Sequence, residues 1–392
     1  MTIALIKKAQ KGRKSIGEPT IAKSAGAALA TAERMPWVDT AKGLSIILVV
    51  MMYSAYNTGE YTGTVGFLHY VIGFTTPFRM PEFFLISGLF LATVIGRPWL
   101  SYADRRIVHY AYFYVLWAAI MIGLKVGIYG HDLSGMFRDA ALAIVEPYGV
   151  LWFIYMLAIF GLVAKLIWQT GISHLVAITF AAALQLANIS TASTIANEFA
   201  AYFVFFYAGY ALGPLIFRLV DWAQHHSTLS ITALLVWALG NGLLVFSSGF
   251  SVQPTATDMG LAAIPPLRLG LAVTGGLAIC VIAGLLVRFP FMDWLRWLGE
   301  HSLVIYVSFT LPMSIFRGIA LNSGLITETG ALSFAVLLVS LASPALIYAL
   351  VKRTGLGTLL FERPNWVRIG RSHDLPVSNR TAQPHAKLES AE

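Results

Sequence analysis

Long apolar blocks recur along this sequence, and they limit the chain to a small set of folds. Each block is about 17 to 25 residues long, the length that a helix needs to cross the hydrocarbon core of a bilayer. Only 12% of the 392 residues are charged, which is about half the fraction usual in a soluble domain. The blocks therefore predict an all-α fold, a polytopic integral membrane bundle with about ten transmembrane helices.

The alternation of basic and non-basic loops predicts the sidedness of these helices. Positively charged loops stay on the cytoplasmic side, so the basic tails predict that both termini lie there. The predicted outer loops at residues 191–196 and 248–266 contain no Lys or Arg, and Arg138 in the outer loop 129–148 is a mild exception. Residues 65–78 and 133–145 are apolar, and 133–145 is too short to cross; 65–78 fits an interfacial helix or an extension of the second span. We place the spans near residues 40–56, 78–96, 109–128, 149–168, 173–190, 197–217, 228–247, 267–287, 301–320 and 330–351.

Three regions follow from this pattern. Residues 1–35 are predicted to be a disordered basic cytoplasmic tail, residues 36–352 the transmembrane domain, and residues 353–392 a polar basic cytoplasmic tail. The net charge of +8 lies in tails and inner loops, so it does not indicate a nucleic-acid partner. Because no His, Cys, Asp or Glu cluster has metal-ligand spacing, we expect no metal.

Charged residues at membrane depth are costly, so each is a candidate functional residue. The first span opens with Asp39 and Lys42, and Tyr53 follows Lys42 by eleven residues. That spacing is about three helical turns, or roughly 16 Å of rise, which puts Lys42 and Tyr53 on one face. Arg79 and Glu82 are three residues apart at the start of the second span, where they can form an ion pair if both are helical. The pair fits either a functional site or a structural bridge that closes the helix end.

Five short motifs, taken in order, resemble those of the membrane acyltransferase-3 family, the integral membrane O-acyltransferases of carbohydrates. The similarity covers roughly residues 36–350. It is carried by Asp39-Thr-Ala-Lys42-Gly43 with Tyr53-Ser54, by Arg79-Met-Pro81-Glu82-Phe-Phe-Leu-Ile-Ser87-Gly88, by Leu151-Trp152-Phe153, by Phe205-Phe-Tyr-Ala-Gly-Tyr210, and by Leu298-Gly-Glu300-His301-Ser-Leu-Val-Ile-Tyr306.

The resemblance implies a membrane enzyme that moves an acyl group, usually acetyl from acetyl-CoA, to a hydroxyl of a cell-envelope or exported carbohydrate. Acyl-CoA is then a co-substrate and no cofactor stays bound. The implied location is a bacterial inner membrane, with membrane lipid, the carbohydrate acceptor and acyl-CoA as partners.

Site roles follow from the same resemblance, in a polar cavity bounded by the first, second and ninth spans. Acyl-CoA approaches from the cytoplasm, where its phosphates contact Arg105, Arg106 and His109. The residues expected to carry the reaction or hold the acceptor are Asp39, Lys42, Tyr53, Arg79 and Glu82 for catalysis, and Ser87, Tyr306, Trp152 and His69 for substrate binding.

The chain departs from the family at the catalytic position. The family has a histidine where this chain has Tyr53, and a phenol with a pKa of about 10 is a poor base at neutral pH. Members often carry two arginines three residues apart after the second span, and here these positions are Arg106 and His109. His69 could replace the missing base, or it could be an interfacial histidine with no catalytic role.

Two other functions remain possible on the sequence alone. The Tyr53 departure favours a catalytically silent member of the same scaffold, acting as a binding or export partner. A secondary transporter is the other alternative, although the chain shows no inverted repeat of the kind that many transporters contain.

Overall fold

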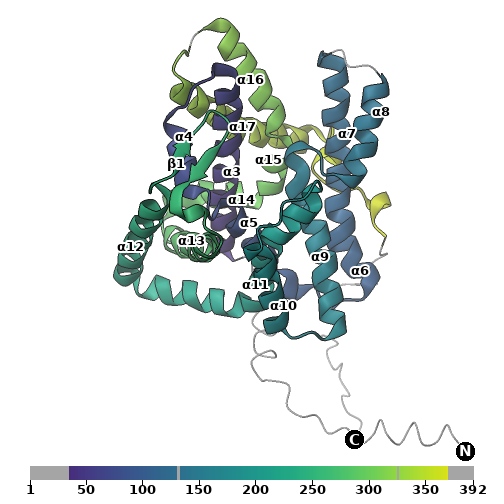
Figure 1. Cartoon of the computed structure of the whole chain (residues 1–392). Helices are drawn as coiled ribbons and strands as arrows, with labels where there is room; N and C mark the ends of the chain where they lie inside the picture. Colours follow the sequence, from purple (N-terminus) through teal and green to yellow (C-terminus); the bar gives the residue numbers. More distant parts are fainter. Residues whose placement is uncertain (1–34, 130–132, 325, 370–392) are drawn as a thin grey trace, which may run out of the picture.

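The computed structural model describes residues 35–129, 133–324 and 326–369. Residues 1–34 of the predicted tail 1–35 and residues 370–392 of the predicted tail 353–392 lie outside this range. The helices, labelled as in Figure 1, are α3 (Pro36–Thr62), α4 (Phe67–Thr75), α5 (Arg79–Leu89), α6 (Trp99–Ala103), α7 (His109–Tyr129), α8 (Leu133–Val145), α9 (Trp152–Thr170), α10 (His174–Leu186), α11 (Thr194–His225), α12 (Ser227–Val245), α13 (Pro265–Leu286), α14 (Asp293–Glu300), α15 (Ser302–Ser308), α16 (Thr310–Ser323) and α17 (Thr329–Thr354).

The predicted all-α polytopic bundle is confirmed, because helices occupy all ten segments that the sequence assigns to spans. Seven helices in the described part are long and apolar enough to cross a membrane. An eighth span is obtained when α15 and α16, which meet at a bend of 51°, are counted together. The segments 78–96 and 173–190 contain only the shorter helices α5 and α10, so length alone does not qualify them as crossings.

Strands are nearly absent from the described residues. The strands β1 (Phe250–Val252) and β2 (Thr257–Met259) form an antiparallel hairpin after α12, with Ser251 opposite Asp258. Residues 65–78 contain α4, a separate helix that contacts this hairpin. Residues 133–145 coincide with α8, which packs against α7.

Helix α3 is the central element of the bundle. It begins at Pro36, whose fixed φ suits a first helical position, and it ends at Gly63, which adopts a φ of 68°. It contacts α5, α13, α14 and α17. Figure 1 shows α7, α8 and α9 together on one side of the molecule and α12 and α13 on the other, with α3 and α5 between them.

Small residues allow α5 to lie directly on α11. A Cβ placed at Gly88 would lie 2.0 Å from the carbonyl oxygen of Phe206, and one at Gly209 would lie 2.0 Å from that of Leu85. Such backbone contact is the usual way in which membrane helices associate tightly. It fixes the depth and rotation of α5, which carries Arg79, Glu82 and Ser87.

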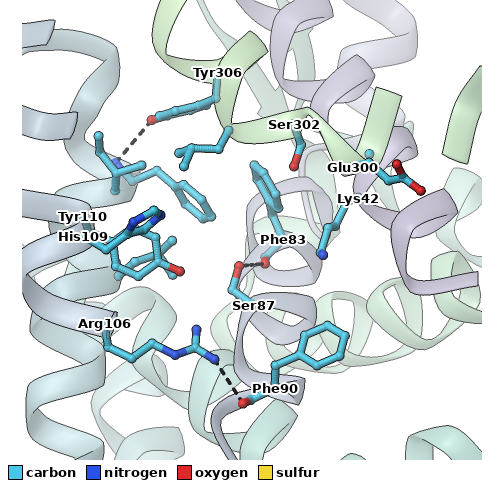
Figure 2. Close-up of a pocket in the computed structure, with 15 residues that line it drawn as sticks. Lys42, Phe83, Ser87, Phe90, Arg106, His109, Tyr110, Glu300, Ser302 and Tyr306 are labelled. Carbon is cyan, nitrogen blue, oxygen red and sulfur yellow. Dashed lines mark hydrogen bonds between the residues drawn. The ribbon is translucent and has the colours of Figure 1, made fainter. Parts of the chain in front are cut away.

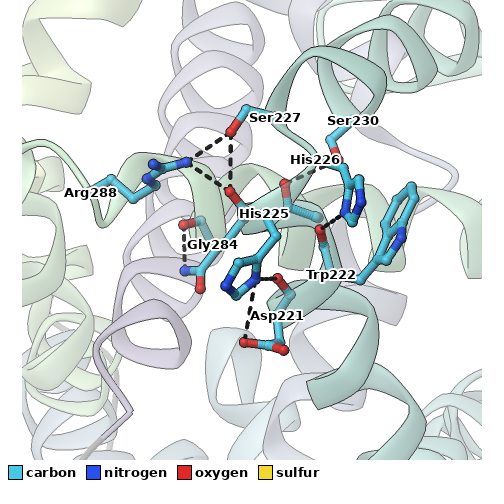
Figure 3. A network of polar contacts seen from close by, with 10 residues as sticks. Asp221, Trp222, His225, His226, Ser227, Ser230, Gly284 and Arg288 are labelled. Carbon is cyan, nitrogen blue, oxygen red and sulfur yellow. Dashed lines mark hydrogen bonds and ion pairs between the residues drawn. The ribbon is translucent and has the colours of Figure 1, made fainter.

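A polar network joins the ends of α11, α12 and α13 (Figure 3). Arg288 Nη1 donates to the carbonyl oxygen of Gln224 and to Ser227 Oγ, both at 2.8 Å, and Gln224 Nε2 donates to the carbonyl oxygen of Gly284 at 2.8 Å. These bonds satisfy helix-end carbonyls that would otherwise lack partners.

Candidate active site

A partly enclosed cavity of about 280 Å³ lies where α3, α5, α7, α9, α14 and α15 meet (Figure 2). Several of the residues predicted from sequence face it. Its lining is Lys42, Phe83, Ser87, Phe90, Arg106, His109, Tyr110, Phe153, Ile154, Leu157, Gly299, Glu300, Ser302, Leu303 and Tyr306.

Two glycines bring α14 against α3 and so build one wall of this cavity. A Cβ at Gly43 would lie 2.2 Å from the carbonyl oxygen of Leu295, and one at Gly299 would lie 1.7 Å from that of Asp39. Neither position can hold a larger residue unless α14 moves. The close approach places Glu300 and Ser302 beside Lys42.

Lys42 stands at the end of α3 that faces the cavity. Its Nζ pairs with Asp39 Oδ1 at 3.0 Å and lies 5.2 Å from the centre of the Phe90 ring. Both contacts hold the ammonium in place while a part of it remains exposed to the cavity. Asp39 is buried and acts on the site through Lys42.

Basic residues enter the cavity from the opposite side. The chain between α6 and α7 makes a π-helical turn at Asp104–Val108, a feature frequent at functional sites. Arg106 donates from Nη2 to the carbonyl oxygen of Phe90 at 3.0 Å, which ties α5 to this turn. His109 follows one helical turn later and also lines the cavity, whereas Arg105 is exposed and lies outside the lining.

The segment after α17 folds back and holds this basic turn. Arg363 donates from Nη2 to Asp104 Oδ2 at 2.7 Å and from Nη1 to the Asp104 carbonyl oxygen at 2.6 Å. The backbone N–H of Ile369 donates to Asp104 Oδ1 at 2.9 Å. The predicted tail at 353–392 therefore includes residues that pack against the transmembrane helices.

Phe83, Phe153 and Tyr306 close the inner end of the cavity, and we call them the aromatic wall. The rings of Phe83 and Phe153 stack with centroids 4.3 Å apart, and Tyr306 lies 5.5 Å from Phe153. The Tyr306 hydroxyl donates to the carbonyl oxygen of Val150 and accepts from the backbone N–H of Phe153 at 3.3 Å. Tyr306 thus joins α15 to the start of α9, and its hydroxyl already has two protein partners.

Arg79 and Glu82 are buried outside the cavity lining, and together with the half-buried Tyr53 we call them the buried polar group. Phe309 packs against both Tyr53 and Tyr306, with ring centroids 5.5 Å from Tyr53 and 6.4 Å from Tyr306. Helices α3 and α5 run antiparallel, so the start of α3 lies beside the end of α5. Lys42 accordingly lies near Phe90, and farther along α3 Met52 Sδ lies 2.9 Å from Arg79 Nη2 at the start of α5.

The ion pair that the spacing of Arg79 and Glu82 allows is not formed. Glu82 is fully buried, its Cα and Cβ lie beside Gly276 of α13, and neither of its carboxylate oxygens has a hydrogen-bond partner in the described structure. Arg79 is also buried, and its Nε and Nη1 are unpartnered there. A spacing of three residues therefore does not by itself bring these two side chains together.

His69 has a structural position. Its Nδ1 accepts from the Gly66 N–H at 3.1 Å and caps the start of α4, and its Nε2 lies 3.1 Å from the Pro254 carbonyl oxygen. With both ring nitrogens engaged and the ring fully buried, His69 has no free nitrogen to take a proton. The geometry therefore argues against His69 as the replacement base.

The remaining predicted residues divide between the cavity and the space behind it. Ser87 lines the cavity and donates to the Phe83 carbonyl oxygen at 2.8 Å. Trp152 is outside the lining and packs 5.7 Å from the ring of Tyr202. Within the described ranges, no group of three or more His, Cys, Asp and Glu side chains could hold a metal ion.

Three polar lining residues were not predicted from sequence: Tyr110, Glu300 and Ser302. Glu300 and Ser302 lie in the motif at residues 298–306, so that motif contained the signal. Tyr110 follows His109 directly and had no signal of its own.

A family model described as an acyltransferase domain, that of the acyltransferase-3 family, matches residues 35–349. No curated protein and no solved structure matched the chain. The family match covers all the residues that line the cavity and all those of the buried polar group.

Proposed function

This chain belongs to the acyltransferase-3 family and is a membrane acyltransferase, and from that premise we propose that it transfers an acyl group from acyl-CoA to a hydroxyl of a cell-envelope or exported carbohydrate. The observation that carries the proposal is the cavity of Figure 2. It brings Lys42, Arg106 and His109 together with the hydroxyls of Ser87 and Ser302.

Phosphate recognition is the role proposed for the basic side of the cavity. A guanidinium donates paired, charge-assisted hydrogen bonds to phosphate oxygens, and Arg106 is held in the lining by its bond to Phe90. Arg105 is the residue before Arg106 in the same turn, and it is exposed. Arg105 and Arg106 are therefore proposed to hold the phosphates of acyl-CoA.

The size of the cavity favours a short acyl group. At about 280 Å³ it lies near the lower end of the range for small-molecule sites, too small for a whole acyl-CoA. The thioester end fits against the aromatic wall while the nucleotide stays near the entrance. Acetyl-CoA is accordingly the proposed donor.

In the proposed reaction the oxygen of the acceptor hydroxyl attacks the thioester carbonyl carbon. A new C–O bond forms, the C–S bond breaks, and the thiol of CoA leaves after it takes up a proton. Lys42 and Ser302 lie across the cavity from His109, where their N–H and O–H groups can stabilise the negative charge that develops on the carbonyl oxygen.

The proposed location is the inner membrane of a bacterium, with both termini and the cavity entrance on the cytoplasmic side. Basic loops favour this orientation, and acyl-CoA is a cytoplasmic metabolite. Single cysteines at residues 20, 193, 255 and 380, in a Cys280→Ala background, test it by membrane-impermeant labelling. External labelling at residue 20 or 380 would contradict the proposed orientation.

A catalytically silent member of the family is the second candidate, favoured by Tyr53 at the position where a histidine is expected. The purified protein in nanodiscs separates the two. With acetyl-CoA and an envelope glycan extract, an enzyme releases CoA thiol and adds one acetyl mass to the glycan. A preparation that binds acetyl-CoA but never releases thiol, and whose loss leaves the glycan masses of the cell unchanged, would support the silent member.

A further inference from the structure

His109 is the one histidine among the residues that line the described cavity. It is the first residue of α7, directly after the π-helical turn that carries Arg106. Its ring packs edge-on against Phe113, with centroids 5.1 Å apart, and that contact fixes the plane of the imidazole. Figure 2 shows it on the wall opposite Lys42 and Ser302.

The other histidines in the described chain have protein partners for a ring nitrogen. His69 uses both nitrogens, and His174 Nδ1 lies 3.1 Å from the Tyr207 hydroxyl. In His225, His226 and His301, Nδ1 lies 2.8–2.9 Å from a carbonyl oxygen of the preceding helical turn. For His109 the described residues supply no such partner, so its nitrogens are available to a ligand in the cavity.

The other candidate bases lack this combination. Tyr53 is not among the residues that line the cavity, and its ring packs against Phe309. Glu300 lines the cavity, but its carboxylate pairs with Arg296 at 3.9 Å. The cavity also contains Lys42, but its ammonium is paired with Asp39 and has no lone pair to accept a proton. His109 combines a ring nitrogen whose lone pair can accept a proton with direct contact to the space for the thioester.

We propose that His109 is the general base of the acyl transfer, an inference that rests on the proposed function. A ring nitrogen takes the proton of the acceptor hydroxyl as the hydroxyl oxygen bonds to the thioester carbonyl carbon. When the C–S bond breaks, the same nitrogen returns that proton to the sulfur, so CoA leaves as a thiol. The net reaction exchanges one C–S bond for one C–O bond and leaves His109 unchanged.

Charged groups on every side of the ring will influence its titration. Those that face it come from the preceding turn, from the segment after α17 and from the opposite wall of the cavity. They are Asp104, Arg106, Arg363, Lys42 and Glu300.

The test uses purified full-length protein in nanodiscs with acetyl-CoA and the glycan acceptor. Loss of a general base typically costs about 10²–10⁴ in turnover, so His109→Gln should lower kcat by that factor and leave KM for acetyl-CoA within a few-fold. His109→Arg should behave alike, because a guanidinium binds phosphate but accepts no proton. His225→Gln, an exposed histidine outside the cavity, is the matched control and should be unchanged.

Chemical rescue sharpens the test. His109→Ala opens space in the cavity lining, so added imidazole should restore turnover, with a pH dependence that follows imidazole rather than the protein. Elution as a monodisperse species and retained binding of CoA establish that the variants are folded.

The two proposals fail in different ways. If the wild-type protein turns over acetyl-CoA and His109→Gln does so equally well, or loses only affinity, His109 is a binding residue and the inference is overturned. If the wild-type protein itself transfers nothing, the proposed function fails and the inference fails with it.

Discussion

The cavity and the buried polar group share helices α3 and α5 and contain similar residue types, yet the environments of their charged side chains differ. In the cavity, Lys42 of α3 is paired with Asp39, and Arg106 bonds to a carbonyl oxygen of Phe90 beyond the end of α5. In the buried polar group, Arg79 and Glu82 retain four side-chain atoms without a partner in the described structure.

This difference indicates that the two regions have different roles. Charges with access to a cavity and protein partners are held ready for a ligand at little cost. Unpartnered buried charges are expensive in a membrane and are retained where function requires them. We therefore propose that acyl-CoA binds in the cavity and that transfer also requires the buried charge of Arg79.

The largest effect is expected at Arg79. Arg79→Ala should lower acyl transfer by more than about 100-fold, because an unpartnered buried charge is retained where function requires it. The variant should still insert and elute normally, since the substitution removes a buried group that has unsatisfied donors. Arg79→Lys should fail as well if a planar fork is needed. Transfer assays on Arg79→Ala beside Arg218→Ala, an exposed arginine, measure this. Full activity in Arg79→Ala would show that Arg79 is a structural residue, and that the cavity and the buried polar group do not differ in function as proposed.

Arg106→Ala tests the phosphate role of the cavity. A charge-assisted hydrogen bond contributes about 1.5–3 kcal/mol, so KM for acetyl-CoA should rise about 10- to 100-fold with a smaller change in kcat. Titration of acetyl-CoA at low and high salt is the measurement, and the wild-type affinity should weaken with salt more than that of the variant. An unchanged KM would place the phosphates elsewhere.

Gly299→Ala tests the contact that positions Glu300 and Ser302. The added Cβ would meet the Asp39 carbonyl oxygen, so α14 must shift, and overpacking of this kind costs about 1–3 kcal/mol. We expect a lower thermal midpoint and turnover reduced several-fold. Gly318→Ala is the matched control, because a Cβ there meets nothing within 4 Å. Equal behaviour of the two variants would show that the approach of α14 to α3 is not required.

Tyr53 is expected to give the smallest effect. Because Tyr53 lies outside the cavity lining and, unlike Arg79, carries no charge at neutral pH, Tyr53→Phe should keep turnover within about three-fold of wild type, and Tyr53→His should not raise it despite the better pKa of imidazole. Parallel kcat measurements decide between the outcomes. A large loss in Tyr53→Phe would mean that the hydroxyl is used, and a gain in Tyr53→His would mean that catalysis reaches the buried polar group.

The sequence predicted the helices well because a local pattern determines them, and five of the predicted site residues line the cavity. Apolar block length located all ten helical segments, and the motifs pointed to Lys42, Ser87, Arg106, His109 and Tyr306, which the cavity brings together. Helix periodicity also placed Lys42 and Tyr53 on one face of α3.

Packing between distant segments was not readable from the sequence. Three different helices contribute the aromatic wall, and of the two residues on one face of α3 only Lys42, not Tyr53, lines the cavity. The spacing of Arg79 and Glu82 permitted a pair, but Arg79 contacts Met52 Sδ and both carboxylate oxygens of Glu82 are unpartnered in the described structure. His69 lay in an apolar segment, and only the fold showed that its nitrogens are engaged.

Protection of an introduced cysteine by acetyl-CoA tests most directly the claim that the cavity is the acyl-CoA site. Ser302→Cys in a Cys280→Ala background places one thiol in the lining, and Ser251→Cys places one in the β1–β2 hairpin as a control. The account predicts that saturating acetyl-CoA slows maleimide labelling of Ser302→Cys at least ten-fold and leaves Ser251→Cys unaffected. Unchanged labelling of Ser302→Cys in the presence of bound acetyl-CoA would contradict it.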